Sequence, residues 1–413
     1  MKNRKYYPWL VVGMLWFVGL LNYLDRQMLS TMKPSMMMDI PELISAANFG
    51  RLMAVFLWIY ALMSPISGII ADKLNRKWLI VGSLFVWSSV TLMMGYAQTF
   101  DQLYALRAIM GVSEAFYIPA GLSLIADYHQ DKTRSLAIGI HSTGIYLGQA
   151  LGGFGATVAS NFSWQLTFHL FGLIGMTYSL ILVFFLKEKK NYVSKKNNEN
   201  VPAKDFFASF RGLGVLLGNI AFWVILFYFS APSLPGWAVK NWLPTLFADS
   251  LNLDMAQAGP MSTITIAISS FFGVLVGGVV SDRWVQKNMK GRIYTSVIGL
   301  FFTIPALILL GYGYSLPTVI GGAMCFGVGF GMFDANNMPI LCQFVSPRYR
   351  ATGYGLMNLV AVASGALITG ILGKSIDAGN LGRDFAVLGV VVLIAIVLQL
   401  ALLHPKTINK IAD

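Results

Sequence analysis

Apolar stretches of about 20 residues recur along the 413-residue chain, and this recurrence limits the fold more than any other feature. We find twelve of them, at 9–32, 49–71, 78–97, 101–127, 136–159, 164–186, 219–247, 260–281, 294–312, 316–344, 350–373 and 384–403. With 56% hydrophobic residues, 12% charged residues and a mean hydropathy of +0.64, the composition does not suit a soluble surface. We therefore predict an all-α membrane protein with twelve transmembrane helices.

The positions of Lys and Arg predict the orientation of these helices. If the N-terminus is cytoplasmic, 23 of the 30 Lys and Arg residues fall in cytoplasmic segments, whereas the outer loops 98–100, 160–163 and 251–259 carry none. We expect a multi-pass protein of the cytoplasmic (inner) membrane with both termini in the cytoplasm. The first stretch is too long for a cleaved signal peptide. The net charge of +12 reflects these loops and does not indicate nucleic-acid binding.

Acidic residues recur at matching places in the first and second parts of the chain. Glu114 stands five residues before a proline in the fourth stretch, and Asp334 does so in the tenth. Asp72 and Asp282 each follow a glycine by four residues, at the ends of the second and eighth stretches. These matches indicate an internal repeat.

The repeat divides the chain into two pseudo-symmetric six-helix halves, 1–186 and 212–413. The polar, Lys- and Asn-rich segment 187–211 is predicted to join them as a cytoplasmic linker. Parallel halves with a site between them near the bilayer midplane are typical of transporters that work by alternating access. A channel does not need such a repeat, although a channel or a non-transporting sensor remains an alternative.

Two acids and two bases lie within the apolar stretches of the first half. Asp25 and Arg26 are adjacent, so on a helix their side chains point about 100° apart. Arg107 and Glu114 are separated by two helical turns, about 10 Å along the axis, and cannot pair with each other. Charged residues inside a membrane face a protein interior or a water-filled cavity. The sequence therefore predicts a network between helices, whose alternative is a set of purely structural ion pairs.

The loop after the second stretch carries a recognisable motif. It reads Gly68-x-x-x-Asp72-Lys-x-x-Arg76-Lys, and in a six-plus-six repeat it resembles the major facilitator superfamily. Asn75 replaces the usual glycine before the basic pair, and we expect it to adopt the left-handed turn that asparagine tolerates. The resemblance implies that Asp72, Arg76 and the repeat mate Asp282 act in gating, through contacts between the halves.

Within that superfamily, Asn-Tyr-Leu-Asp25-Arg26 together with Arg107 and Glu114 resembles the anion:cation symporter branch, which includes sialin-like, hexuronate and sugar-acid transporters. The resemblance implies that Asp25 and Glu114 bind the coupling protons. It implies that Arg26 binds the substrate carboxylate and that Arg107 interacts with the neighbouring acid. Arginine suits the first of these roles because its planar guanidinium matches a carboxylate and stays charged.

Three further residues of the first half are candidate substrate contacts. Tyr23 and Tyr60 would line the cavity as hydroxyl donors, or else pack between helices. Gln149 stands where drug antiporters of the superfamily usually have proline, which argues against drug efflux. Its amide suits either substrate hydroxyls or a neighbouring helix. The glycines spaced around it, at 144, 148 and 152, predict a close approach between helices.

The second half adds a polar group in the tenth stretch. Asp334, Asn336 and Asn337 suit substrate hydroxyls, a hard cation such as Na⁺, or packing. Asn358 stands where related symporters have an asparagine that contacts the substrate. We expect Lys240 at the outer end of the seventh helix, with its ammonium group in the headgroup region.

The function that we predict is proton-coupled symport of a small organic anion, a sugar acid such as a hexuronate or an aldonate, by alternating access. The alternatives are a spinster-type lysolipid or sphingolipid transporter and a neutral-sugar proton symporter. No phosphate-binding loop or catalytic set is present, and the four histidines and two cysteines lack metal-ligand spacing, so neither an enzyme nor a metal site is expected. We expect no cofactor besides the coupling ion, H⁺ with Na⁺ left open. We expect a monomer whose partners are its substrate and the lipid bilayer.

Overall fold

The computed structural model describes residues 3–129, 133–189, 214, 216–218, 220–345 and 350–403. Most of the predicted linker 187–211 lies outside these residues. The described chain is helical without strands, and its elements are α1 (Asn3–Met36), the 3₁₀ turn η1 (Pro41–Ile44), α2 (Ala46–Lys73), α3 (Arg76–Met94), α4 (Phe100–Glu114), α5 (Tyr117–Tyr128), α6 (Arg134–Gly152), α7 (Gly155–Asn161), α8 (Trp164–Phe185), α11 (Ile220–Leu251), α12 (Met255–Val285), α13 (Gly291–Tyr312), α14 (Leu316–Asp334), α15 (Asn337–Phe344), α16 (Arg350–Asp377) and α17 (Leu381–Leu402).

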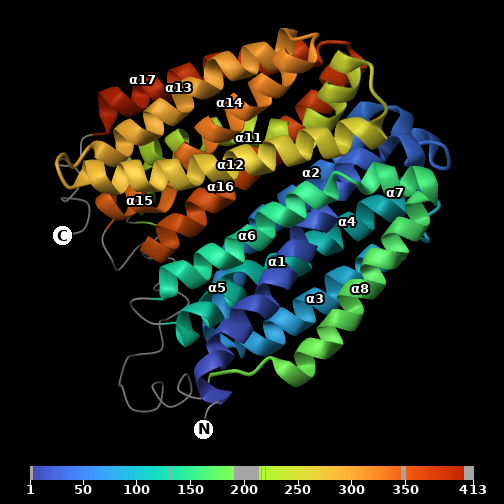
Figure 1. Ribbon diagram of the computed structural model, residues 1–413, viewed down its shortest axis with the longest axis horizontal. Coiled ribbons are helices and arrows are strands. Elements are labelled where there is room, and N and C mark those ends of the chain that lie inside the picture. The colour runs from blue at the N-terminus through green and yellow to red at the C-terminus, as the bar shows by residue number, and fades with distance from the viewer. Residues whose placement is uncertain are drawn as a thin grey trace.

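The predicted all-α membrane fold is confirmed. Within the described residues, 11 helical segments are long and apolar enough to cross a membrane. The remaining predicted stretch, 136–159, is divided between α6 and α7 by a turn at Gly153 and Phe154. The helices form two bundles that lie side by side, α1 to α8 in one and α11 to α17 in the other (Figure 1). Below, these bundles are called the N half and the C half.

The glycines of α6 allow it to lie directly against α1, as their spacing predicts. A Cβ atom on Gly144 or Gly148 would collide with the backbone carbonyl of Trp16 or Leu20, respectively. A Cβ on Gly152 would lie 2.9 Å from the carbonyl oxygen of Leu24. Since α1 carries the central charged residues, this contact holds it firmly within the N half.

The two acids that the sequence matches occupy the same structural place. Glu114 is the last residue of α4, and Asp334 is the last residue of α14. Each is followed by a two-residue interruption and then by a short helix, α5 or α15. A carboxylate at a helix C-terminus faces the negative end of the helix dipole and therefore needs donors from elsewhere.

The halves are joined at one end by a carboxylate that caps a helix of the opposite half. Asp377, the last residue of α16, accepts hydrogen bonds from Ser45 Oγ (2.8 Å) and from the backbone N–H groups of Ala46 (2.7 Å) and Ala47 (2.9 Å). These groups form the N-terminus of α2. We call this contact the Asp377 cap.

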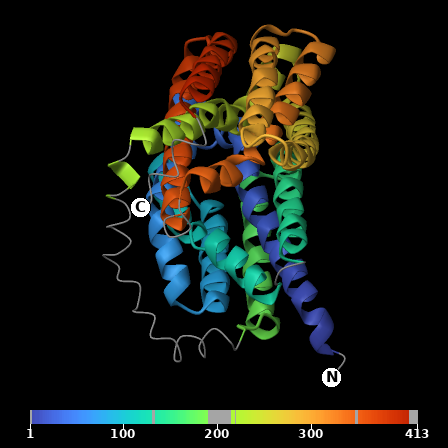
Figure 2. The same cartoon turned by 90° about the vertical axis from the view of Figure 1, so that its left-hand side faces the viewer.

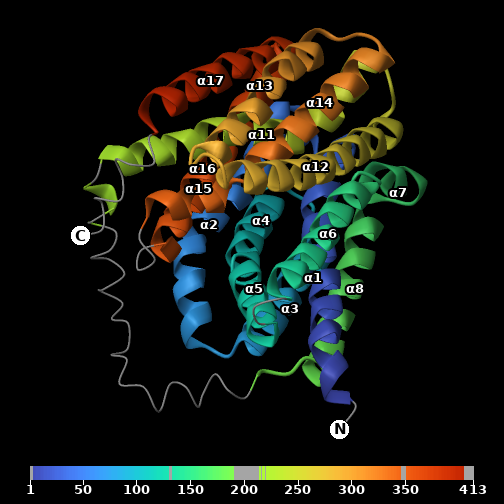
Figure 3. The same cartoon turned by 60° about the vertical axis from the view of Figure 1, so that its left-hand side comes forward.

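A second contact at this end joins α6 and α7 to the start of α12 (Figure 3). Gly153 and Gly259 lie backbone to backbone, so that a Cβ atom on Gly153 would lie 2.8 Å from the carbonyl oxygen of Gly259. Thr157 Oγ1 donates to the carbonyl of Ala256 at 2.8 Å, and Thr263 Oγ1 donates to that of Ala150 at 3.0 Å. In the view turned by 90°, most of the C half lies above the N half (Figure 2).

The residues predicted to act in gating lie away from this contact. The side chain of Asp72 lies outside the described part of the structure. Arg76 forms an ion pair with Asp127 of α5, and Asp282 pairs with Arg292 of α13 at 3.3 Å, so both of these pairs stay within one half. The prediction of a left-handed turn at Asn75 is wrong. Asn75 has φ −66° and is the N-cap of α3, where its side chain accepts a hydrogen bond from the backbone N–H of Trp78.

Candidate functional site

The charged residues of the N half gather where α1, α2 and α4 meet. Glu114 is fully buried, with 0% of its surface exposed. Its Oε2 atom accepts hydrogen bonds from Arg26 Nε at 2.6 Å and from Asn22 Nδ2 at 2.9 Å, both on α1. Its Oε1 atom has no partner among the described residues. The central contact is therefore a buried ion pair between α1 and α4.

Aromatic rings surround the guanidinium group of Arg26. Its Cζ atom lies 5.0 Å from the ring centre of Tyr23, 4.9 Å from that of Phe56 and 4.6 Å from that of Tyr60. These distances allow cation–π attraction. Nη2 of Arg26 has no hydrogen-bond partner within the described chain. The rings of Tyr23 and Tyr60 thus lie beside Arg26, and its Nη2 atom is a donor without a partner in the described chain.

Arg107 shares the Phe56 ring with Arg26. It is 3% exposed, its Cζ atom lies 4.6 Å from the ring centre of Phe56, and its Nη1 atom donates to Met110 Sδ at 3.1 Å. The described residues offer it no ion pair, although its charge interacts with those of Glu114 and Asp25 over a longer distance. Phe56 therefore lies next to two buried cations.

Asp25 and Arg26 face different helices, as expected for adjacent residues. Asp25 is 4% exposed, and its Oδ2 atom accepts a hydrogen bond of 3.4 Å from Thr91 Oγ1 on α3. Its Oδ1 atom has no partner in the described part of the chain. Asp25 is thus a weakly held buried acid. Nothing in the sequence singles out Thr91, because one threonine in an apolar helix is common.

In the C half, Asp334 contrasts with its repeat mate. Its side chain is exposed, and its Oδ1 atom accepts a hydrogen bond of 3.0 Å from Asn337 Nδ2, at the start of α15. Its charge interacts with that of Lys240 on α11, yet the two do not form an ion pair among the described residues. Tyr23 and Tyr146 of the N half and Tyr354 of the C half interact electrostatically with Asp334, so this acid is influenced by residues of both halves.

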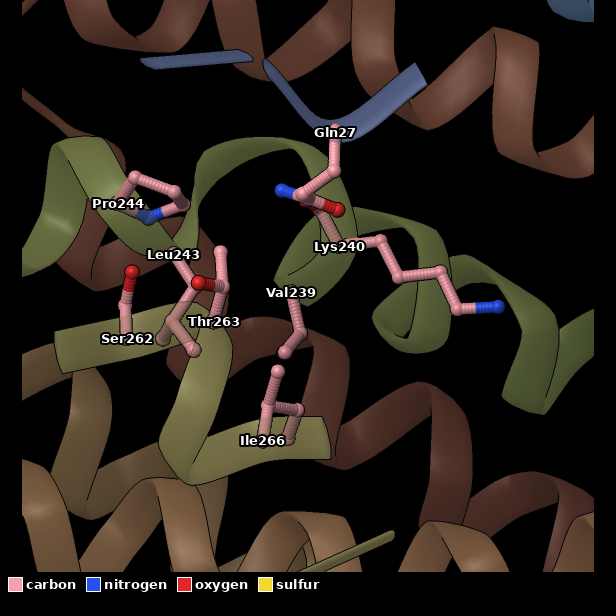
Figure 4. A pocket seen from close by; sticks show the side chains of 8 residues that line it. All are labelled: Gln27, Val239, Lys240, Leu243, Pro244, Ser262, Thr263 and Ile266. Carbon is pink, nitrogen blue, oxygen red and sulfur yellow. The ribbon is translucent and has the colours of Figure 1, made fainter. Parts of the chain in front are cut away.

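The prediction that Lys240 lies at the outer end of its helix is wrong, because Lys240 lies 11 residues before the end of α11. Its charge interacts with Asp334 and Arg26, and its backbone carbonyl accepts a hydrogen bond of 2.9 Å from Gln27 Nε2 on α1. A narrow gap at this contact, too small to hold a water molecule, has Ser262 and Thr263 of α12 in its wall. The Lys240 side chain extends away from these two residues (Figure 4). Lys240 is therefore a residue of the site that sequence reasoning missed.

Three other predicted substrate contacts are engaged with the protein or buried against it. Asn336 is fully buried, and its Nδ2 atom donates to the carbonyl of Met332 at 2.8 Å, within the helix interruption. Asn358 Nδ2 donates to Ser64 Oγ of the N half at 3.1 Å. Gln149 is 7% exposed and forms no hydrogen bond with the described residues. The structure thus brings Asp334 and Asn337 together, while Asn336 and Asn358 have protein partners.

No group of three or more His, Cys, Asp or Glu residues in the described ranges has the arrangement of a metal site. The carboxylates of the site can exchange protons, and its cationic groups can bind anions. Three acids (Asp25, Glu114 and Asp334) and three bases (Arg26, Arg107 and Lys240) lie in one region of the molecule. An anion that enters this balanced set adds a charge that a proton can neutralise.

Comparisons with known proteins agree with this description. Residues 15–370 match the family model described as Major Facilitator Superfamily. A hexuronate transporter of Bacillus subtilis (strain 168) is 24% identical, covering 92% of this chain and 90% of the relative. A D-galactonate transporter of Escherichia coli O6:H1 is 24% identical, covering 92% and 97%. A solved bacterial homologue of the human lysosomal transporter Spinster, inward-facing and unoccupied, superposes with a TM-score of 0.79 at 20% identity, covering 98% of both chains.

Proposed function

The chain belongs to the Major Facilitator Superfamily, as the sequence predicts, and is a transporter and not an enzyme; from its charged site we propose that it carries a small organic anion together with a proton. The observation that carries this proposal is the buried ion pair of Arg26 and Glu114. Removing one partner of such a pair leaves an uncompensated buried charge, which is costly. Protonation of Glu114 has this effect on Arg26.

A substrate carboxylate restores the balance. It takes the place of Glu114 next to Arg26, whose Nη2 atom is already free of partners in the described chain. Charge-assisted hydrogen bonds between arginine and a carboxylate are strong and directional. The proton and the anion therefore favour each other's binding, which is the condition for symport. Asp25, whose hydrogen bond from Thr91 is long at 3.4 Å, is the second candidate proton site.

A sugar acid is the substrate class that this site supports best. The relatives named for hexuronate and D-galactonate support it, although at low identity. A neutral sugar has no carboxylate to compensate Arg26. A lysolipid is the second candidate, because of the structural similarity to a Spinster homologue. The open polar groups of Asp334 and Asn337 favour a hydroxylated substrate over an acyl chain.

The arrangement of the halves supports alternating access. We infer that the Asp377 cap and the Gly153–Gly259 contact close the outer side, so that this is the inward-facing arrangement with both termini in the cytoplasm. Asp72, Arg76 and Asp282 would then form contacts between the halves in the outward-facing state. The predicted location in the inner membrane fits the same orientation.

The test is uptake into proteoliposomes under an imposed inward proton gradient. Labelled glucuronate, galactonate, a neutral hexose and a lysolipid are compared, each with and without a protonophore. We expect sugar-acid uptake that the protonophore abolishes and that Arg26→Ala removes. The matched control is Arg383→Ala, at an exposed arginine whose ion pair lies within α17. Lysolipid movement without sugar-acid uptake would overturn the proposal in favour of the lipid transporter.

A further inference from the structure

The three cations of the site differ in how available they are to an incoming anion. Arg26 is engaged with Glu114, and its side chain is 11% exposed. Arg107 is 3% exposed. Lys240 is partly exposed, and within the described residues its ammonium group forms neither a hydrogen bond nor an ion pair. Lys240 is therefore the cation that an anion can reach before any existing pair is broken.

Two contacts hold Lys240 at the level of the charged centre. Its backbone carbonyl accepts the hydrogen bond from Gln27, the residue that follows Arg26 on α1. Its Nζ atom lies 4.9 Å from the ring centre of Trp237, one turn earlier on α11, within range of cation–π attraction. The residue comes from the C half, whereas Arg26 comes from the N half, and their charges interact.

The charge of Asp334 interacts with that of Lys240, but the two groups form no ion pair among the described residues. The carboxylate of Asp334 is exposed and accepts one hydrogen bond, from Asn337. An ionised carboxylate only accepts hydrogen bonds, whereas an ammonium group only donates them. A ligand that fits both must therefore present an acceptor anion next to a donor. A carboxylate with a hydroxyl group on the neighbouring carbon has this pattern.

We propose that Lys240 is the first contact for the carboxylate of the substrate, that Asp334 accepts the adjacent hydroxyl group, and that the transporter therefore selects 2-hydroxy acids. This inference rests on the proposed function and names its substrate class more closely. Once Glu114 is protonated, Arg26 becomes available to the same carboxylate. The anion then bridges the C half through Lys240 and the N half through Arg26, which ties its binding to the relative movement of the halves.

The test is equilibrium binding of labelled galactonate, and of its 2-deoxy analogue, to the purified full chain in detergent. We expect Lys240→Gln to weaken galactonate binding about tenfold or more, because a charge-assisted hydrogen bond is lost. Lys240→Arg should retain most of the affinity. Asp334→Asn should reduce the preference for galactonate over the 2-deoxy analogue, since an amide accepts the hydroxyl less strongly. Lys287→Gln, the same change at an exposed position, is the matched control.

A double variant separates recognition from simple charge balance. If Lys240 only compensates Asp334, the neutral combination of Lys240→Gln with Asp334→Asn should bind galactonate as wild type does, and this would overturn the proposal. If Lys240 binds the carboxylate, the double variant should remain at least as weak as Lys240→Gln. Elution volume and thermal unfolding of each variant show whether it is folded. Lys240→Arg keeps the positive charge and shows whether that charge is sufficient for binding.

The outcome for the wild type distinguishes the two proposals. A wild-type protein that neither binds nor takes up any sugar acid contradicts the proposed function itself. A wild type that takes up sugar acids with protons, while Lys240→Gln binds them with unchanged affinity, contradicts only the role of Lys240. Equal affinity of the wild type for galactonate and its 2-deoxy analogue contradicts the 2-hydroxy acid selectivity.

Discussion

Glu114 and Asp334 occupy the same place in the two halves but have opposite surroundings. Each is the last residue of a helix inside a membrane span, immediately before a two-residue interruption. Glu114 is fully buried and is held by Arg26 and Asn22 of another helix. Asp334 is exposed, and among the described residues its one hydrogen-bond donor is Asn337, three residues further on. The same helix interruption thus carries a buried ion pair in the N half and an exposed carboxylate in the C half.

This difference indicates that the two halves have different roles in transport. A buried acid that already has a cationic partner responds to a proton by releasing that partner. An exposed acid with one amide donor is ready to accept hydrogen bonds from a ligand. We therefore expect proton coupling to depend on the N half and recognition of hydroxyl groups on the C half. Four predictions test this division, from the largest expected effect to the smallest.

The largest effect is expected from Glu114→Gln. The amide can still accept a hydrogen bond from Arg26, but it cannot take up a proton. Gradient-driven accumulation of the sugar acid should fall about 100-fold, the order expected when a charged interaction is lost, while exchange of labelled for unlabelled substrate persists. Wild-type uptake should rise as the external pH falls, and that of the variant should not change with pH. Uptake assays across a pH series measure both.

The matched change in the C half is Asp334→Asn. It should lower the affinity for substrate and leave the dependence on the proton gradient intact. If Asp334→Asn abolishes proton-driven accumulation while Glu114→Gln retains it, the assignment of the two roles is reversed.

The second effect is expected from Phe56→Leu. Its ring attracts two buried guanidinium groups, and a desolvated cation–π contact contributes roughly 2 kcal/mol. We expect about a tenfold loss in kcat/KM for uptake. Phe229→Leu is the control in the C half, because this buried ring faces Tyr228 and Phe333. Equal losses in uptake for both variants would mean that packing, and not cation–π attraction, explains the effect.

The third effect concerns the end where the halves meet. Asp377→Asn weakens the Asp377 cap, since an amide has one acceptor oxygen where the carboxylate has two. Because the site is exposed, we expect only about a fivefold shift in the balance of conformations, the scale of a single modest hydrogen bond. Spin labels at Met38 and Tyr314, both strongly exposed, report it as a longer distance between the halves.

Asp282→Asn provides the contrast for this third prediction. Its ion pair with Arg292 lies within the C half, so the distance between the labels should stay as in the wild type. A distance distribution that moves in Asp282→Asn and not in Asp377→Asn would contradict the proposed role of the cap.

The smallest effect is expected from Thr91→Val. The hydrogen bond from Thr91 to Asp25 is long, at 3.4 Å, and such a contact contributes less than about 1 kcal/mol. The KM for uptake should stay within about twofold of the wild-type value. A tenfold increase would show that Asp25 depends on this single contact, and that the N half contains two tightly held acids instead of one.

Much of the fold follows from periodicity and charge. The apolar stretches, the glycine spacing of α6 and the matched acids before Pro119 and Pro339 all correspond to features of the structure. The network between helices was also predictable, because neither Arg26 nor Glu114 can pair with its neighbour in sequence. Which acid meets which base was not predictable, since that depends on the rotation of α1 against α4.

Two residues of the site show where reasoning from sequence fails. Phe56 is an apolar residue in an apolar helix, and nothing in its surroundings along the chain signals the two cations beside it. Lys240 was misplaced because its depth depends on the packing of α11, a 32-residue helix that contains three prolines, against α1. A lysine in a long membrane helix could be placed only once the hydrogen bond from Gln27 to its carbonyl was known.

The contact between Gly153 and Gly259 also provides a means of controlling the molecule. A Cβ atom on Gly153 would collide with the Thr263 side chain and lie 2.8 Å from the backbone carbonyl oxygen of Gly259, so one added methyl group would act as a wedge. Gly153→Ala cannot adopt the arrangement seen here without spreading the two helices. Such a variant would hold the protein in the opposite stage of its cycle, where antibodies or inhibitors that recognise that stage could be selected against it.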